Sequence, residues 1–315
     1  MTRSRVLITC PQLQRTIDEH RAELDEAGIE IVLPPVVQQL TEDQLVALLP
    51  GADGIIAGDD PLTAKVLASA DRLCIISKWG VGVDNIDLRA AAQRGIKVTN
   101  TPGMFGDEVA DVVIGYLILL ARRLHRVDQL MRSGEWPKIE GVSLAGRTLG
   151  IVGLGAIGQS VARRAMAMGM QVLGTDIDES KAATGTEIGV RLMGLPELLG
   201  QVDALSLNCP LTEDNRHMIN SSTLAAMRPG VWIINTARGP LIDERALVEA
   251  LASRKVAGAA LDVFEVEPLP AESALRQFDS VIMGSHNSSN TVEAVRRTSQ
   301  LAIQHLLGGL AGVGR

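Results

Sequence analysis

The stretch "IVGLGAIGQS", residues 151–160, decides the expected fold. Its apolar start predicts the end of a buried strand, and its three spaced glycines predict a tight turn into a helix. Glycines at these positions let backbone N–H groups at a helix N-terminus approach a pyrophosphate. We therefore expect a dinucleotide cradle made by Gly153, Gly155, Ala156, Ile157 and Gly158.

The next predicted strand, "QVLGTD", ends on Asp176, which lies 176 − 158 = 18 residues after the third glycine. An acid at this place accepts hydrogen bonds from the adenosine ribose and repels a 2′-phosphate. The sequence therefore predicts NAD as the cofactor and disfavours NADP. A second Gly-Val-Gly occurs in "WGVGVDNID" (79–87), but the third fingerprint position there is Asn85, so we expect no second dinucleotide site.

Short apolar runs alternate with helical stretches on both sides of this motif, which predicts parallel strands with right-handed crossovers. A first series starts at "RVLIT" (5–9), continues into one helix over 13–28 and ends near Pro102-Gly103. A long helix is expected at about 106–132, and a second series follows it. The last helix, 291–309, is expected to pack back on the first series.

The predicted fold is therefore α/β with two domains. A Rossmann-type NAD-binding domain, residues 100–287, is inserted into a smaller flavodoxin-like α/β substrate-binding domain, residues 1–99 plus 288–315. Apolar residues make up 46% of the 315 residues but aromatics only 2%, so aliphatic side chains must fill the cores, as suits buried parallel strands.

Composition excludes several classes of function. A net charge of −7 disfavours binding to nucleic acids or anionic membranes. The longest apolar run, "VVIGYLILLA" (112–121), is about half the length needed to span a bilayer. Three widely spaced cysteines predict neither disulfides nor a zinc site, and no metal is expected; a cytoplasmic location fits best.

Polar residues follow the predicted strands of the second series, where ligands bind in open parallel sheets. They are Asp176, Cys209-Pro210, Thr236, Arg238, Asp262 and His286. Oxidation of a hydroxy acid by a nicotinamide requires a general base, which histidine suits near neutral pH. A neighbouring carboxylate orients the ring, and an arginine binds a substrate carboxylate bidentately. His286, Glu267 and Arg238 are the candidates, with Glu265 as the competitor of Glu267.

The motifs "NTARGPLIDERALVEAL", "AGAALDVFEVEP" and "SHNSSNT", placed after the glycine motif and Asp176, resemble those of the D-2-hydroxyacid dehydrogenase family. This family includes D-3-phosphoglycerate dehydrogenase and glyoxylate/hydroxypyruvate reductase. The resemblance covers essentially the whole chain, and its "EP" pattern favours Glu267 over Glu265. It implies an enzyme that interconverts D-2-hydroxy acids and 2-keto acids.

By this resemblance Arg238 binds substrate, His286 is the acid/base and Glu267 is its partner. Asp262 is expected to hold the nicotinamide carboxamide. The other expected cofactor contacts are Val81, Cys209, Pro210, Thr236, Ala237, Arg238, His286 and Ser288. The loop of Lys78, Trp79, Gly80 and Val81 is expected to bind the substrate carboxylate through its backbone N–H groups. The long helix resembles the family's dimer-forming element, so a homodimer is expected.

Two departures from the family pattern leave alternatives open. Ser285, Asn287 and Ser288 make the surroundings of His286 unusually polar, either to tune its acidity or to bind the cofactor. Asp59 and Asp60 stand where phosphoglycerate dehydrogenases carry an arginine, and two acids there should repel a phosphate. The alternatives are a phosphoglycerate dehydrogenase proper and an NADH-sensing binding protein of the corepressor type.

Overall fold

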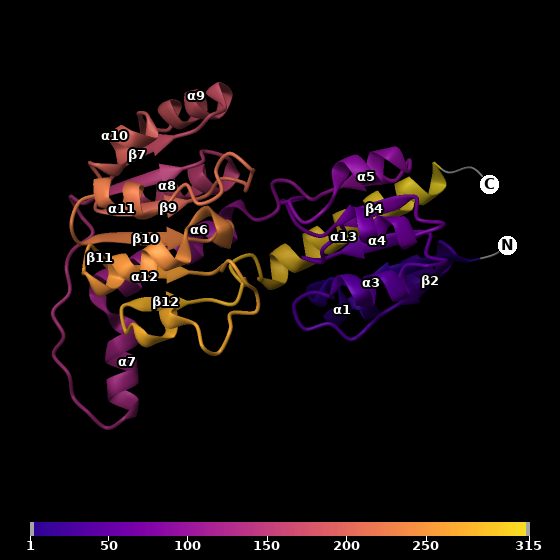
Figure 1. The fold of residues 1–315 in the computed structure, drawn as a ribbon, viewed down its shortest axis with the longest axis horizontal. Helices are drawn as coiled ribbons and strands as arrows, with labels where there is room; N and C mark the ends of the chain where they lie inside the picture. Colours follow the sequence, from indigo (N-terminus) through magenta and orange to yellow (C-terminus); the bar gives the residue numbers. More distant parts are fainter. Residues whose placement is uncertain (1–2, 313–315) are drawn as a thin grey trace. The chain divides into compact units, whose positions relative to one another are not determined.

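The computed structural model describes residues 3–312 and divides into two compact units (Figure 1). Unit 1 holds the chain up to Met104 and again from Asn290, and unit 2 holds Phe105–Ser289. The sequence predicts these boundaries after residues 99 and 287, so the units divide a few residues further along the chain.

Unit 1 is built on a parallel sheet of order β2-β1-β3-β4-β5, the order of flavodoxin-like sheets. The strands are β1 (Ser4–Ile8), β2 (Ile29–Val32), β3 (Gly54–Ala57), β4 (Ile75–Lys78) and β5 (Lys97–Thr99). The helices are α1 (Pro11–Arg15), the 3₁₀ turn η1 (Ile17–Glu19), α2 (Arg21–Glu26), α3 (Glu42–Leu48), α4 (Ala64–Ser69), α5 (Leu88–Gln93) and α13 (Val292–Ala311).

Neighbouring residues of β4 show how both faces of this sheet are covered. Ile76 lies in the apolar cluster shared with α3, α4 and α5. Ile75 points to the opposite face, because successive side chains of a strand alternate. There it packs against Gly309 of α13, a helix that contacts both β3 and β4. The C-terminal helix thus belongs to the core of unit 1.

Unit 2 is built on a parallel sheet of order β12-β11-β10-β9-β6-β7-β8, the doubly wound Rossmann order with one further strand. The strands are β6 (Thr148–Val152), β7 (Gln171–Thr175), β8 (Arg191–Leu192), β9 (Ala204–Leu207), β10 (Val231–Asn235), β11 (Val256–Leu261) and β12 (Val281–Met283). The helices are α6 (Gly106–Arg122), α7 (Leu124–Arg132), α8 (Ala156–Ala167), α9 (Glu179–Glu187), α10 (Leu195–Leu199), α11 (Ser221–Ala226), α12 (Glu244–Ala252) and the 3₁₀ turns η2 (Gly239–Leu241) and η3 (Ala274–Gln277). The predicted α/β class with two parallel sheets is confirmed.

The helix predicted over 13–28 is wrong as one element. The structure divides it into α1, η1 and α2. Thr16 ends α1, and its hydroxyl lies 3.4 Å from the carbonyl oxygens of both Gln12 and Leu13. A side chain that bonds locally to the backbone offers an alternative to the regular helix.

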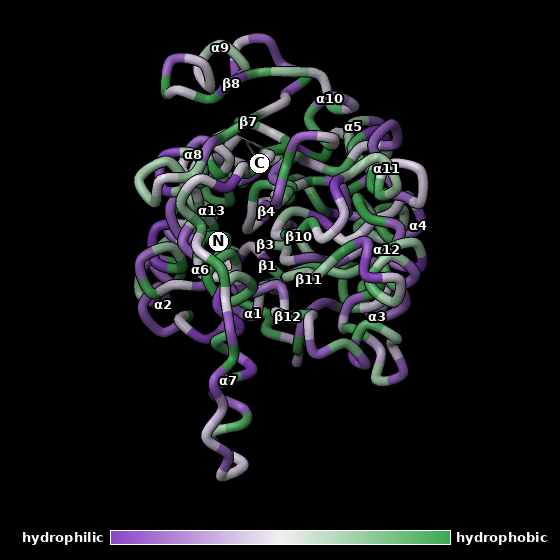
Figure 2. Tube along the Cα trace, turned by 90° about the vertical axis from the view of Figure 1, so that its left-hand side faces the viewer, coloured by the Kyte–Doolittle hydropathy of each residue, from purple (hydrophilic) through white to green (hydrophobic). Residues whose placement is uncertain are grey.

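The helix predicted over 106–132 is also interrupted. Arg123 takes a left-handed backbone with φ 51°, so α6 ends there and α7 begins. The Ala121 carbonyl, which a continuing helix would use, instead accepts from the backbone N–H of Val142 at 2.8 Å. None of the α7 residues is buried. Figures 1 and 2 both show α7 projecting away from the sheet of unit 2, and the colours of Figure 2 show both hydrophilic and hydrophobic residues along it.

Within residues 3–312, no helix combines the length and the apolar character that crossing a bilayer requires.

Candidate active site

The glycine motif opens α8 at the carboxyl end of β6. A Cβ atom on Gly158 would lie 2.0 Å from the Gly153 carbonyl oxygen, so only glycine allows this close approach of helix and turn. Gly155 is the N-cap of α8, and a Cβ there would meet no atom within 4 Å. The helix N-terminus therefore faces open space, which suits a pyrophosphate.

Asp176 follows β7 and is tied to this turn. Its Oδ2 accepts from the backbone N–H of Leu154 at 2.6 Å, and its Oδ1 accepts from that of Asp178 at 2.9 Å. These two hydrogen bonds fix the carboxylate beside the glycine turn. Each oxygen keeps further lone-pair capacity for ribose hydroxyls.

Two further strands end on residues that we expected to line the cofactor. Thr236 follows β10, and its buried Oγ1 has no hydrogen-bond partner among the described residues. A buried hydroxyl without a protein partner usually forms its hydrogen bond with a ligand or with water. Cys209 follows β9, where burial, and to a smaller extent the Asp176 charge, raises its thiol pKa to about 11. A raised thiol pKa favours the neutral thiol, which is a weaker nucleophile than the thiolate.

His286 and Glu267 are in direct contact. The His286 Nδ1 lies 2.8 Å from Glu267 Oε2, and both side chains are largely buried, at 23% and 17% exposure. The other oxygen of Glu267, Oε1, accepts from the backbone N–H of Phe264 at 2.9 Å. Glu267 rather than Glu265 is thus the carboxylate that orients the ring of His286.

The turn that carries His286 is held by Asp262, which is 1% exposed. The Asp262 carboxylate accepts from the backbone N–H groups of Asn287 (3.1 Å) and Ser288 (2.8 Å) and from the Ser288 hydroxyl. The backbone N–H of His286 donates to the Asp262 carbonyl at 2.7 Å, and His286 takes a left-handed φ of 54°. The polar neighbours Asn287 and Ser288 thus hold the strained turn through Asp262.

Arg238 stands in the turn between β10 and η2. Asn235, fully buried, locks this turn because its amide donates to the Arg238 carbonyl at 2.8 Å and accepts from the Ala237 N–H at 3.0 Å. The guanidinium Nη1 of Arg238 donates to the Ala237 carbonyl at 2.8 Å. Sequence reasoning did not include Asn235, although an asparagine at a strand end is a recognisable turn signal.

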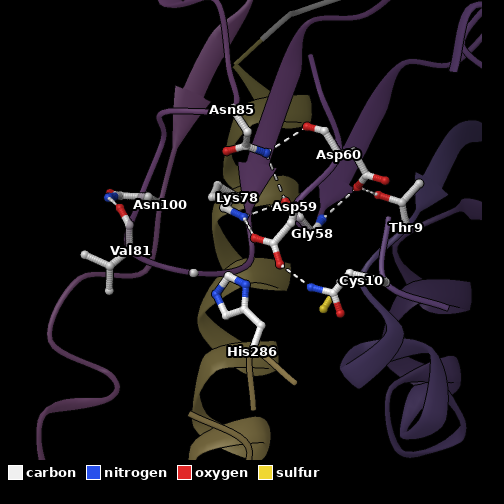
Figure 3. A network of polar contacts seen from close by, with 12 residues as sticks. Thr9, Cys10, Gly58, Asp59, Asp60, Lys78, Val81, Asn85, Asn100 and His286 are labelled. Atoms are coloured by element: carbon white, nitrogen blue, oxygen red, sulfur yellow. Dashed lines mark hydrogen bonds and ion pairs between the residues drawn. The ribbon is translucent and has the colours of Figure 1, made fainter. Parts of the chain in front are cut away.

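The predicted substrate loop lies in unit 1 at the end of β4. The Lys78 side chain is buried, and its ammonium donates to Asp59 Oδ1 at 2.9 Å and to the Gly58 carbonyl (Figure 3). The backbone N–H of Gly80 donates to Thr101 Oγ1 at 3.0 Å, whereas Val81 is exposed. The lysine and the Gly80 N–H therefore hold the loop in shape, a role that the sequence did not reveal.

Comparison with known proteins places this site in a family. The model of the D-isomer-specific 2-hydroxyacid dehydrogenase NAD-binding domain matches residues 114–288. A hydroxypyruvate reductase of Thermotoga maritima is 40% identical over 266 residues, which cover 82% of this chain and 85% of that protein. A glyoxylate reductase of Thermococcus litoralis is 40% identical over 319 residues, covering 95% and 93%. The chain belongs to the D-isomer-specific 2-hydroxyacid dehydrogenase family.

A solved structure agrees with this assignment. D-lactate dehydrogenase from Aquifex aeolicus, complexed with NAD and lactic acid, matches with a TM-score of 0.85 and 28% identity, covering 98% of this chain and 96% of that one. The family resemblance predicted from the motifs is confirmed, and the chain is an oxidoreductase of the NAD-binding dehydrogenase type. The matched segment contains the glycine turn, Asp176, Arg238, Glu267 and His286.

Asp59 and Asp60, the two acids that the sequence predicts to repel a phosphate, have different environments in this dehydrogenase. Asp60 is fully buried and accepts hydrogen bonds from the Thr9 hydroxyl and from the Gly58 N–H at 3.0 Å (Figure 3). It also accepts from the Leu40 N–H at 2.8 Å. Burial raises the pKa of its carboxyl, and the Thr9 hydrogen bond opposes this shift. Asp60 is thus a structural anchor, and Asp59 alone remains as a candidate for contact with a ligand.

Proposed function

We propose that this dehydrogenase interconverts an unphosphorylated D-2-hydroxy acid and its 2-keto acid, with His286 as the general acid/base. The contact between Glu267 and the Nδ1 of His286 at 2.8 Å carries this proposal. It fixes the ring and its tautomer and stabilises the protonated imidazole, as an orienting carboxylate does in other acid/base pairs. Nε2 is then the nitrogen that exchanges a proton with the substrate oxygen.

Each residue of the site has its own proposed role in the reduction of the keto acid. The glycine turn and Asp176 would hold NADH, which would supply the hydride for reduction of the keto acid. His286 donates a proton to the carbonyl oxygen, so that C=O becomes CH–OH, and the reverse reaction returns the proton to His286. Arg238 binds the substrate carboxylate and polarises the carbonyl. Glu267 holds the compensating negative charge throughout.

The cofactor proposal is NAD in preference to NADP. The open N-terminus of α8 and the orphaned hydroxyl of Thr236 suit a dinucleotide. Asp176 is held beside the turn by Leu154 and Asp178 and cannot swing away from a 2′-phosphate without losing both hydrogen bonds. The further proposed contacts are Ala156, Ile157, Pro210, Ala237, Asp262 and Ser288, together with Val81 in unit 1.

The proposed substrate carries no phosphate. Lys78, the cation of the substrate loop, is paired with Asp59, and the Asp59 side chain is 33% exposed. The pair has no net charge, so it does not offer the excess of cations that a phosphate requires. The loop of Lys78, Trp79, Gly80 and Val81 is proposed to bind the small acid. Because the N–H groups of Trp79 and Gly80 donate to the Ala57 carbonyl and to Thr101 Oγ1, the backbone of the exposed Val81 is the proposed contact.

A substrate panel tests this function. We expect turnover with NADH and glyoxylate, hydroxypyruvate or pyruvate, followed by nicotinamide absorbance, and a kcat/KM with NADPH at least about tenfold lower. Stronger turnover of phosphohydroxypyruvate than of hydroxypyruvate would instead identify a phosphoglycerate dehydrogenase. Tight NADH binding without any turnover would favour a sensing protein.

We further propose a homodimer that uses α7 and the segment after it. Four apolar side chains of this region are exposed: Leu124, Met131, Trp136 and Val142, at 45%, 42%, 75% and 38%. A second copy of the chain that covers them would account for their exposure. Light scattering after size exclusion should give twice the chain mass of 33.5 kDa, and Met131→Glu together with Trp136→Glu should give the mass of one chain.

The proposed location is the cytoplasm. All three cysteines are free, which is the state expected in a reducing compartment.

A further inference from the structure

A reciprocal clamp joins the start of α12 to the turn after β11. The backbone N–H of Glu265 donates to Glu244 Oε1 at 2.6 Å, and the backbone N–H of Glu244 donates to Glu265 Oε1 at 3.1 Å. Each carboxylate thus holds the backbone of the other segment. Because hydrogen bonds to charged groups are stronger than neutral ones, the clamp fixes the two segments together.

A third segment is attached to the same clamp. His217 Nε2 lies 2.9 Å from Glu265 Oε1, and the backbone N–H of His217 donates to the Pro240 carbonyl at 2.8 Å. His217 has a left-handed φ of 53°, a conformation that costs energy for a residue with a side chain. The Asn220 amide, which donates to the His217 carbonyl at 2.9 Å, helps to hold it there.

The clamped segments leave no space between their backbones. A Cβ atom on Gly239 would lie 1.9 Å from the carbonyl carbon of Phe264 and 2.5 Å from the nitrogen of Glu265. The turn that carries Arg238 therefore rests directly on the turn that carries Glu265. A shift of one turn must move the other.

Glu267 lies two residues beyond this contact and takes its position from the same turn. Its Oε1 accepts from the Phe264 N–H, and its Oε2 contacts His286. The carboxylates are close enough to influence one another: burial raises the pKa of Glu244, with smaller contributions from the charges of Glu265 and Glu267 and an opposing one from the Glu265 N–H. His217 Nε2 lies against the same Glu265 oxygen that accepts from the Glu244 N–H.

We propose that Glu265 and Glu244, with His217, are positioning residues for the Glu267–His286 pair and for Arg238. The proposal rests on the acid/base role proposed above for His286. None of the three needs to touch substrate or cofactor. They fix the Phe264–Glu267 turn against the Arg238 turn, so that the oxygen of Glu267 and the guanidinium of Arg238 keep their working positions.

Alanine and glutamine at position 265 separate positioning from folding. Glu265→Ala removes the acceptor of the Glu244 N–H and should lower kcat about tenfold, since a small misplacement of a catalytic pair is costly. The KM for NADH should stay within about twofold, because the glycine turn and Asp176 are untouched. Glu265→Gln keeps an acceptor oxygen and should restore most of the lost kcat. Glu249→Ala, an exposed position on α12, is the matched control and should leave kcat unchanged.

Two outcomes would overturn the proposal: a kcat for Glu265→Ala within about twofold of wild type, or an equal loss of kcat in the alanine and glutamine variants. If Glu265→Ala does not fold, as judged by thermal melting, the same comparison at Glu244 decides, with the same expected results. Failure here is distinguishable from failure of the proposed function. If the wild-type enzyme is active, His286→Ala is inactive and Glu265→Ala keeps its activity, only the positioning role is contradicted.

Discussion

The His286→Ala variant should turn over 2-keto acids with a kcat about two to four orders of magnitude below that of the wild type, the usual contribution of a positioned acid/base. Without the imidazole, the carbonyl oxygen must take its proton from water while the hydride is transferred. Glu267 does not replace it, because its carboxylate contacts Nδ1 and therefore lies on the other side of the ring from Nε2, the nitrogen proposed to transfer the proton. Steady-state rates with the best keto acid of the panel measure the loss directly.

Binding of NADH should survive this change. The glycine turn and Asp176 are held by their own hydrogen bonds, and the turn at 286–288 keeps its contacts with Asp262 through Asn287 and Ser288. Fluorescence titration with NADH should give a Kd within about threefold of wild type. His125→Gln, at a histidine of α7 whose ring contacts the Asp279 carbonyl, is the control and should keep full activity. A His286→Ala enzyme with more than a tenth of the wild-type kcat would contradict the acid/base role.

The fold could be predicted largely because its signals are local. The glycine turn, the acid after the second strand of unit 2 and the alternation of strands with helices are each contained in short segments, and the two parallel sheets follow from them. The break at Arg123 has no such local signal. It depends on the hydrogen bond from Val142 to Ala121, which forms only after the chain has turned back on itself. A helical pattern alone therefore predicts a helix that is too long.

For the site, too, the sequence predicted which residues can carry the chemistry but not which contacts they make. Residue type and place at a strand end were enough to name His286 and Arg238. The sequence did not predict the environment of either acid. Asp59 and Asp60 are adjacent in sequence, but their burial and hydrogen-bond partners differ in the structure. Asp60 is buried under three hydrogen bonds, and Asp59 pairs with Lys78. The two acids lie in the loop after β3, where the tertiary contacts and not a regular strand pattern decide the surroundings of each side chain.

Replacing Arg238 with lysine should lower kcat/KM for the keto acid by about two to three orders of magnitude, although the charge is kept. A guanidinium offers two parallel N–H groups to a carboxylate, and an ammonium acts as a point charge. The turn should survive, because Asn235 bonds to the backbone carbonyl of residue 238 and not to its side chain. The loss should appear in both kcat and KM, since this residue is proposed to bind the ground state and to polarise the carbonyl.

The matched control is Arg245→Lys, at an exposed position of α12 whose side chain pairs with Glu249. It should change kcat/KM less than twofold, since exposed ion pairs contribute about 0–1 kcal/mol. A carbonyl substrate without a carboxylate separates the two tasks of Arg238. If the residue binds that carboxylate, wild type and Arg238→Lys should differ far less with an aldehyde or ketone substrate than with glyoxylate. Equal losses on both substrates would mean that Arg238 acts on the carbonyl alone, and a lysine variant with near wild-type kcat/KM on glyoxylate would remove it from the proposed mechanism.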